Sequence, residues 1–336
     1  MATLNDVAEE AGVSPTAVSR YLNNRIELPQ ATRDRIDAAI AKLDYRPNLL
    51  AKRLSTGKTE AISLVTPEIA NPFFAELAAA VEAEAERHGY AVYISSTGGS
   101  RAKEIDALNR LRDQHVDGLI MMTNQPDDGT LARLLKGAGN VVLLDEDVPD
   151  VAVPRVFVEN VEGAYLAANH LIELGHDDIA LISGPAELFS VRERLAGFER
   201  AMDEARLPVR AHWILLKDYS RQFGYEAMRW LLKQSPRPTA VLACSDYLAI
   251  GALKAVREAG LTVPGDISLV GFDDMPFAEL VDPPLTTVRQ PIADMGRIAF
   301  ERLMAVLNKT PAPALTRLPV ELVVRKSVAP AKRKTN

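Results

Sequence analysis

The sequence predicts two parts: an all-α headpiece that contains a helix-turn-helix, and a two-lobed α/β core with doubly wound parallel sheets. Three observations support this fold class. Residues 1–47 hold three short helical patterns, separated by a glycine and by prolines. From Ala61 onward, short apolar strands alternate with helical stretches, which is typical of parallel sheets. About nine such strands favour two sheets over one very wide sheet.

The composition is that of a globular protein with more than one domain. The 336 residues are 47% apolar and 25% charged, and the formal net charge is -6. Residues 1–59 carry nine Lys or Arg against seven Asp or Glu, so this part is +2 and the remainder is -8. The single cysteine excludes an intramolecular disulfide, and no apolar run is long enough to span a bilayer. With no secretory signal visible at the N-terminus, we expect a cytoplasmic protein.

The headpiece helices have recognisable start signals. Thr3 and Asp6 form a capping-box pattern at the first helix, which a glycine ends. Ser14 followed by Pro15 gives a cap and a first-turn proline for the second helix, and a further proline opens the third. Residues 48–59 are expected to form a linker that contains a short helix.

In the core, apolar runs predict strands and the stretches between them predict helices. Ligands of doubly wound sheets bind beyond the carboxyl ends of the strands, so a cleft between two lobes would place both sets of strand ends around one ligand. The predicted strands are Ala61–Thr66, Ala91–Ser96, Gly118–Met122, Val141–Asp145, Ile179–Ser183, Ile214–Lys217, Ala240–Ala243 and Ile267–Gly271. The predicted helices are Phe74–His88, Ala102–His115, Gly163–Leu174, Arg192–Glu204 and Ile250–Ala259.

Residues 4–23 have the helix, glycine turn and helix spacing of a helix-turn-helix. The second helix of this motif lies in the major groove of DNA, with its N-terminal residues at the base edges. Arg20 can contact guanine or a phosphate, and the serine and threonine hydroxyls suit phosphate oxygens. The generic pattern is only moderately specific, so a three-helix packing domain is the alternative. The predicted DNA-contacting residues of this helix are Ser14, Pro15, Thr16, Ala17, Ser19 and Arg20.

Beyond this generic pattern, Val13–Asn23 followed by Tyr45-Arg-Pro-Asn48 resembles the lactose-repressor (LacI/GalR) family of bacterial transcription regulators. The resemblance covers essentially the whole chain. In that family the segment after the proline forms a hinge helix on DNA, and a leucine at the position of Leu54 wedges into the minor groove. Packing within a linker is the alternative for this leucine. The resemblance adds Thr3, Asn23, Tyr45, Asn48, Ala51 and Leu54 to the DNA-contacting residues.

The rest of the chain resembles the periplasmic-binding-protein-like core of this family. That resemblance implies two lobes that close over a small-molecule effector, a sugar or sugar derivative, and so change the affinity for operator DNA. It also implies a homodimer on a pseudo-palindromic operator. The expected N-terminal lobe comprises residues 60–160 and 289–318, and the C-terminal lobe comprises 161–288 and 319–328. Residues 329–336 are expected to form a disordered tail.

The resemblance also assigns effector-binding residues. Asparagine and phenylalanine after the first core strand bond hydroxyls and stack on a sugar ring, and we expect one phenylalanine to line the cleft and the other to pack in the core. Family sugar binders often have arginine after the aspartate at position 145, whereas this chain has Glu146, which suggests a bulkier polyol, an amine-bearing ligand or a solvated rim residue. The implied effector-binding residues are Asn71, Phe73, Phe74, Asp145, Arg192, Arg194, Tyr219, Ser245, Asp273 and Gln290.

Other function classes fit the sequence less well. The dinucleotide, P-loop, zinc-protease and serine-hydrolase motifs do not occur, and the five histidines are scattered. We therefore expect no catalytic residues, no cofactor and no metal. A cytoplasmic sugar-binding protein without regulatory DNA binding is the alternative, but it leaves residues 1–59 unexplained. A purely architectural DNA binder would not need the long core.

Overall fold

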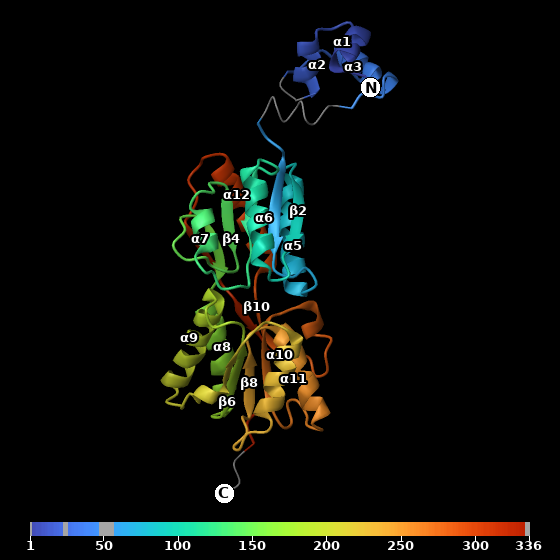
Figure 1. Ribbon diagram of the computed structural model, residues 1–336. Helices are drawn as coiled ribbons and strands as arrows, with labels where there is room; N and C mark the ends of the chain where they lie inside the picture. The colour runs from blue at the N-terminus through green and yellow to red at the C-terminus, as the bar shows by residue number, and fades with distance from the viewer. Residues whose placement is uncertain (1, 23–25, 47–56, 333–336) are drawn as a thin grey trace. The chain divides into compact units, whose positions relative to one another are not determined.

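The structure is a computed structural model that describes residues 2–22, 26–46 and 57–332. The chain divides into two compact units, Met1–Thr59 and Glu60–Asn336. The first unit has one cluster of buried apolar residues, and the second has four. The second unit consists of two α/β lobes, so the predicted fold class is confirmed (Figure 1).

Three helices form the described part of the headpiece: α1 (Leu4–Ala11), α2 (Pro15–Leu22) and α3 (Gln30–Lys42). At the start of α1, the Thr3 hydroxyl accepts the Asp6 amide and the Asp6 carboxylate accepts the Thr3 amide, which is the predicted capping box. Gly12 ends α1 with φ at 65°, a left-handed conformation that glycine adopts without strain. The turn that follows lets Val18 of α2 pack against Ile36 of α3 in a small core.

The N-terminal lobe contains a six-stranded sheet in which every neighbouring pair is parallel. The strand order is β11-β5-β4-β3-β1-β2. Its strands are β1 (Ala61–Thr66), β2 (Ala91–Ser96), β3 (Gly118–Met121), β4 (Val141–Leu144), β5 (Arg155–Val158) and β11 (Leu315–Leu318).

The C-terminal lobe repeats this arrangement in the order β12-β10-β9-β8-β6-β7, with only β12 antiparallel to its neighbour. In each lobe the order in which strands are added to the sheet changes direction beside the first strand. This switch point lies between β1 and β3 in one lobe and between β6 and β8 in the other. Ligands of doubly wound sheets bind at such switch points. The strands are β6 (Ile179–Ser183), β7 (Ile214–Leu216), β8 (Ala240–Ala243), β9 (Ser268–Asp273), β10 (Thr286–Arg289) and β12 (Glu321–Val323).

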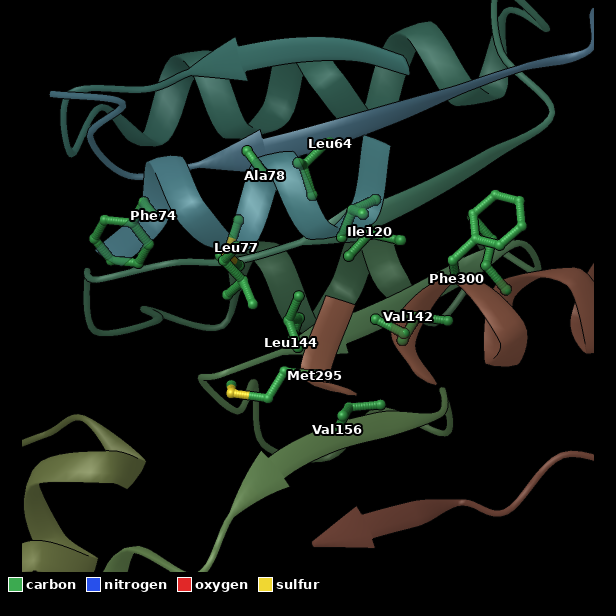
Figure 2. Packing of buried hydrophobic residues seen from close by; sticks show 14 of the residues in the cluster. Leu64, Phe74, Leu77, Ala78, Ile120, Val142, Leu144, Val156, Met295 and Phe300 are labelled. Atoms are coloured by element: carbon green, nitrogen blue, oxygen red, sulfur yellow. The ribbon is translucent and has the colours of Figure 1, made fainter. Parts of the chain in front are cut away.

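Helices cover both faces of each sheet. In the N-terminal lobe, α5 (Pro72–Arg87) and α12 (Ile292–Leu307) pack on one face, and α6 (Arg101–Arg112) and α7 (Thr130–Leu135) pack on the other. Figure 2 shows the first of these interfaces, where alternate strand residues such as Ile120 and Val142 meet Leu77 of α5 and Phe300 of α12. In the C-terminal lobe, α8 (Asn160–Glu173) and α9 (Phe189–Glu204) lie opposite α10 (Arg221–Leu231) and α11 (Asp246–Glu258). Two short 3-10 helices span Ala211–Trp213 and Pro276–Ala278.

The lobes are joined by three chain crossings within residues 57–332. These follow β5, β10 and β11, after Val158, Arg289 and Leu318. Helix α12 therefore belongs to the N-terminal lobe, although it is close to the end of the sequence.

Several elements were missed by the sequence analysis. Strand β5 was missed, as were the edge strands β11 and β12, whose exposed and half-buried residues of mixed polarity give little strand signal. Helix α10, by contrast, has buried residues at helical spacing, such as Phe223, Ala227 and Leu231, so its pattern was there to be found. Helices α7 and α12 were missed as well.

The expected disordered tail is wrong for its described part, residues 329–332. The Ala329 carbonyl bonds Nε2 of buried His176 at 2.9 Å, and the Ala331 amide donates to the Leu174 carbonyl at 2.8 Å. These contacts attach the segment to the C-terminal lobe. Among the described residues, no helix combines the length and apolar character needed to cross a membrane.

Candidate functional site

The exposed face of α2 presents the polar residues predicted to contact DNA. Pro15, Thr16 and Arg20 are exposed, and Ala17 and Ser19 are half-buried. The Ser14 hydroxyl is also exposed and accepts the Ala17 amide at 3.2 Å, which fixes the start of the helix. Because Val18 points into the core, this packing leaves the opposite side of α2 available to a groove.

The other predicted DNA-contacting residues are placed less favourably or are not described. Tyr45 differs from the prediction, since it is 9% exposed and packs in the headpiece core with α1 and α3. Thr3 is exposed, but its hydroxyl and amide are used in the capping box. Asn23, Asn48, Ala51 and Leu54 lie outside the described residues.

A cavity of about 230 Å³ lies between the two core lobes. It opens at the carboxyl ends of the central strands of both sheets, where the strand order reverses. This volume is somewhat below the ~300–1,000 Å³ of typical ligand pockets, so the cavity suits a small molecule. Each lobe contributes eight lining residues: Glu68, Asn71, Phe73, Phe74, Thr123, Asn124, Asp145 and Glu146 from the N-terminal lobe, and Leu188, Ser190, Arg194, Asp218, Tyr219, Ser220, Ser245 and Asp273 from the C-terminal lobe.

The start of α5 forms the aromatic wall of the cavity. Asn71 caps the helix by accepting the Phe73 amide at 3.2 Å, and Pro72 occupies the first turn. The Phe73 and Phe74 rings meet edge to face with their centroids 5.2 Å apart. Both rings line the cavity and both belong to the core cluster, so the expectation that one lines and the other packs is wrong.

Arg194 of α9 is the one arginine among the lining residues, and it is held rigidly. Its Nε donates to Asn160 Oδ1 at 2.9 Å, its Nη1 donates to the Cys244 carbonyl at 2.6 Å, and its guanidinium lies 3.8 Å from the Phe272 ring centroid. Within the described residues, Nη2 makes no hydrogen bond to the chain. The side chain is 4% exposed, so a preorganised cation with donors to spare lies at the cavity wall.

Two aspartates face this cation from the two lobes. Burial raises the pKa of Asp145 to about 7 and that of Asp273 to about 6, and Arg194 opposes both shifts. Asp273 accepts Ser245 Oγ at 3.0 Å and Gln290 Nε2 at 2.8 Å, whereas the Asp145 carboxylate accepts no hydrogen bond from the described residues. Both have positive φ, 70° and 113°, a conformation that aspartate adopts more readily than most residues and that turns both residues out of their strands. Carboxylates of this kind are acceptors for ligand hydroxyls.

Tyr219 lies against the end of β6, where the chain has Gly184. A Cβ at that glycine would approach the tyrosine ring to 2.3 Å, so only glycine leaves room for the ring. Burial raises the pKa of Tyr219 to about 12, and the phenol is therefore neutral at physiological pH. The ring and hydroxyl give the cavity a second aromatic wall.

Glu146 is neither a solvated rim residue nor a free acceptor. It is 2% exposed, and its oxygens accept Phe189 N at 2.6 Å, Ser190 Oγ at 2.7 Å, and the amides of Ser190 and Asp147. Burial raises the pKa of this carboxyl, and these hydrogen bonds oppose the shift. The rim alternative is therefore wrong.

Two predicted effector-binding residues do not line the cavity. Arg192 is exposed and donates to the Glu187 carbonyl. Gln290 is buried behind the cavity wall and orients Asp273. Conversely, Thr123 and Asn124 line the cavity directly after β3 and were missed, although the rule that ligands bind beyond strand ends applied to them as well. Also missed were Glu68, Leu188, Ser190, Asp218 and Ser220.

The lining is strongly acidic overall. It carries five carboxyl groups, on Glu68, Asp145, Glu146, Asp218 and Asp273, against one guanidinium. Burial raises the pKa of Asp145, Glu146 and Asp273, but the excess of carboxyl groups over cations still disfavours an anionic ligand and favours one rich in hydrogen-bond donors. No group of three or more His, Cys, Asp or Glu among residues 2–22, 26–46 and 57–332 is placed to hold a metal ion.

Comparisons with known proteins match both parts of the chain. Residues 3–48 match the model of bacterial regulatory proteins of the lacI family, and residues 168–328 match the periplasmic binding protein-like domain. The HTH-type transcriptional repressor PurR of Proteus mirabilis is 38% identical over 98% of this chain and 97% of its own length. The chain of the lac repressor dimer bound to operator and the anti-inducer ONPF is 32% identical, with a TM-score of 0.86 over 98% of this chain and 99% of that one.

A third similarity is to the transcriptional regulator CelR in complex with cellobiose. It is 33% identical, with a TM-score of 0.74 over 97% of this chain and 100% of that one. Identity above 30% over nearly full length, together with the headpiece and the two-lobed core, shows that this chain belongs to the lacI family of DNA-binding transcriptional regulators.

Proposed function

We propose that this regulator binds a two-fold operator as a homodimer and that a neutral sugar in the interlobe cavity changes its affinity for that operator. The observation that carries the proposal is the cavity itself, which eight residues from each lobe line, among them Arg194 and two aspartates. A ligand that contacts both lobes has a different affinity for each lobe arrangement, and this difference is the physical basis of a coupling free energy.

On the DNA side, α2 is the recognition helix. Thr16 and Ala17 face base edges, Arg20 bonds guanine or phosphate, and Ser14 and Ser19 bond phosphate oxygens. Leu54 kinks the operator centre by wedging into the minor groove. Two copies of the helix meet the two half-sites of a pseudo-palindrome, as the symmetry of a homodimer requires.

On the effector side, the chemistry of the lining supports a sugar. Two aromatic walls suit the apolar face of a ring, and the Asp145 and Asp273 carboxylates suit its hydroxyl donors. The five carboxyl groups disfavour sugar acids and sugar phosphates. The cellobiose complex of the similar regulator CelR is consistent with this ligand class.

We also propose where in the cell the protein acts and that it is not an enzyme. Operator DNA lies in the bacterial cytoplasm, so the protein acts there. The relatives are regulators, and the cavity residues serve binding, so we propose no catalytic activity, no cofactor and no metal.

The deciding experiment is a footprint of the purified protein on DNA that flanks its own gene, with and without small molecules. The panel contains pentoses, hexoses, disaccharides, sugar acids and free nucleobases. We expect a protected palindrome that a neutral sugar erases or strengthens, and the direction gives the sign of the coupling. Protection that only a sugar acid or a nucleobase alters overturns the effector class, and no protection even at low salt overturns operator binding.

A further inference from the structure

Helix α9 begins without a cap of its own. Its N-cap residue is Leu188, whose side chain offers no acceptor, and no side chain of its own segment caps the helix. The first amides of a helix lack intrahelical partners and carry a partial positive charge. Here the acceptor is Glu146, which follows β4 in the other lobe and takes the amides of Phe189 and Ser190 together with the Ser190 hydroxyl.

The Glu146 carboxylate is fully used in this role. An ionised carboxylate offers about four lone-pair sites, and four donors occupy them: three from the start of α9 and the amide of Asp147. Although Glu146 lines the cavity, it has no acceptor left for a ligand. Apart from its charge, its effect on an effector is therefore expected to act through α9.

Two more contacts attach the first two turns of α9 to the N-terminal lobe. Arg317 of β11 forms a two-pronged ion pair with Glu193, at 2.6 and 2.9 Å, and both side chains are largely shielded from solvent. The ring of Phe157 of β5 lies 4.8 Å from the ring of Phe189. Neither Arg317 nor Phe157 lines the cavity.

The turn that these contacts hold also carries effector-site residues. Ser190 and Arg194 are four residues apart on α9, so they lie on one helix face, and both line the cavity. We propose that Glu146 is a positioning residue of the effector site: it caps α9 across the cleft and holds Ser190 and Arg194 against the N-terminal lobe before an effector binds. The proposal rests on the proposed function only in assuming that the cavity is the effector site.

The consequence is an effector site that is assembled in the ligand-free protein. The apparent affinity of a ligand falls in proportion to the fraction of protein in the binding-competent arrangement. Weakening the interlobe cap lowers that fraction, so it raises the dissociation constant although Glu146 itself has no acceptor free for the ligand.

The test uses the full-length, ligand-free protein and three variants. Glu146→Gln removes the charge and half of the acceptors. Arg317→Gln breaks the second interlobe contact without touching the cavity. Asp147→Asn is the matched control, because the ion-pair partner of this neighbouring carboxylate, Arg155 at 2.8 Å, lies in its own lobe and its side chain does not cap α9. Spin labels on the exposed positions Asp106→Cys in α6 and Glu199→Cys in α9 report the distance between the lobes, since the native cysteine is buried.

We expect hydrogen exchange at the Phe189 and Ser190 amides to accelerate about fivefold or more in Glu146→Gln. The label distances should broaden or lengthen in both Glu146→Gln and Arg317→Gln and stay unchanged in Asp147→Asn. Faster exchange with unchanged distances would reduce Glu146 to a local helix cap and overturn the positioning role. Unchanged exchange and distances would overturn the proposal altogether.

Ligand titrations complete the test, with D-ribose, D-glucose and cellobiose as probes. For a sugar that binds the wild type, we expect the dissociation constant to rise at least about threefold in both interlobe variants. Equal affinity despite altered distances would overturn the positioning role. If none of these sugars binds, the label distances decide alone: altered distances in both interlobe variants support the positioning role, and unchanged distances overturn it.

Discussion

The headpiece and the core cavity use the same kinds of residue in opposite ways. In α2, serine, threonine and arginine stand on an exposed face, and seven buried apolar residues behind them maintain the fold. In the cavity, Arg194 and Asp273 are withdrawn from solvent, and hydrogen bonds to other buried groups fix them. An exposed surface suits DNA, which is a large and hydrated polyanion. A desolvated site strengthens each polar interaction and penalises each one that is missing.

The largest expected effect is at Arg194, whose buried guanidinium depends on fixed hydrogen bonds. Arg194→Lys keeps the charge but loses the fixed fork that bonds Asn160 and Cys244. Calorimetry with the effector found by footprinting should show a loss of affinity of about 100-fold. The matched control is Arg200→Lys on the same helix, which pairs with Glu162 at the surface. A change of less than threefold at Arg194 would remove it from the effector site.

The next effect concerns the exposed region. Arg20→Ala should weaken binding to the operator by about 10- to 100-fold, the worth of one good base contact, and leave the thermal stability of the core unchanged. Lys42→Ala is the control, since its ammonium group bonds Glu10 at 2.8 Å. Competition between operator and non-specific DNA measures both. Equal weakening on both DNAs would show that Arg20 contacts phosphate alone.

A smaller effect is the pH dependence of effector affinity, which we expect in the cavity. The pKa of Asp145 is raised to about 7 in the ligand-free cavity, so this carboxyl group gains a proton as the pH falls below 7. Ligand hydroxyls bond the ionised form, so affinity should fall by up to about tenfold per pH unit below 7 and level off above it. Fluorescence titration between pH 5.5 and 8 measures this. A flat profile in the wild type would contradict an ionised Asp145 in the complex.

The variant Asp145→Asn tests the raised pKa of this carboxyl group through the thermal stability of the protein. A folded-state pKa above the unfolded value costs stability, and this cost grows as the pH rises from about 4 to 7. The variant should therefore melt at a higher temperature than the wild type at pH 8, while the difference shrinks at pH 5, and it should bind the effector more weakly. Scanning calorimetry at both pH values provides the measurement.

The smallest effect is expected at the exposed hydrogen bond between Tyr21 and Asp37, with distances of 2.9 and 3.0 Å. Tyr21→Phe should lower the melting temperature of the headpiece by at most a few degrees, because water replaces a lost exposed bond. Val18→Ala, in the core behind it, should destabilise the headpiece clearly more. Circular dichroism melting of both variants checks this order. The reverse order would show that the headpiece depends on its surface network.

The sequence predicted best where local rules apply. The capping box at Thr3, the glycine turn and the start of α2 follow from neighbours within a few residues, and the structure has all of them. Strands such as β1 and β6 were predicted with their observed bounds, whereas β5, β11 and β12 were missed. Tyr45 was assigned to DNA by resemblance, but the packing of three helices places it in the core. Local patterns do not report which face of an aromatic residue is covered.

Taken alone, the sequence determined the two-part architecture and the exposed face of the recognition helix, because periodicity and capping are encoded by residues close together in the chain. The family was indicated by the resemblance of Val13–Asn23 and Tyr45–Asn48. The tertiary structure decided which polar residues share the cavity. Asp145, Arg194 and Asp273 come from three strand-end or helix-start segments, and only the two sheets bring them together. It also decided the role of Glu146, whose partners on α9 lie more than 40 residues further along the chain. A residue's hydrogen-bond partners across a cleft depend on packing, and no spacing rule encodes them.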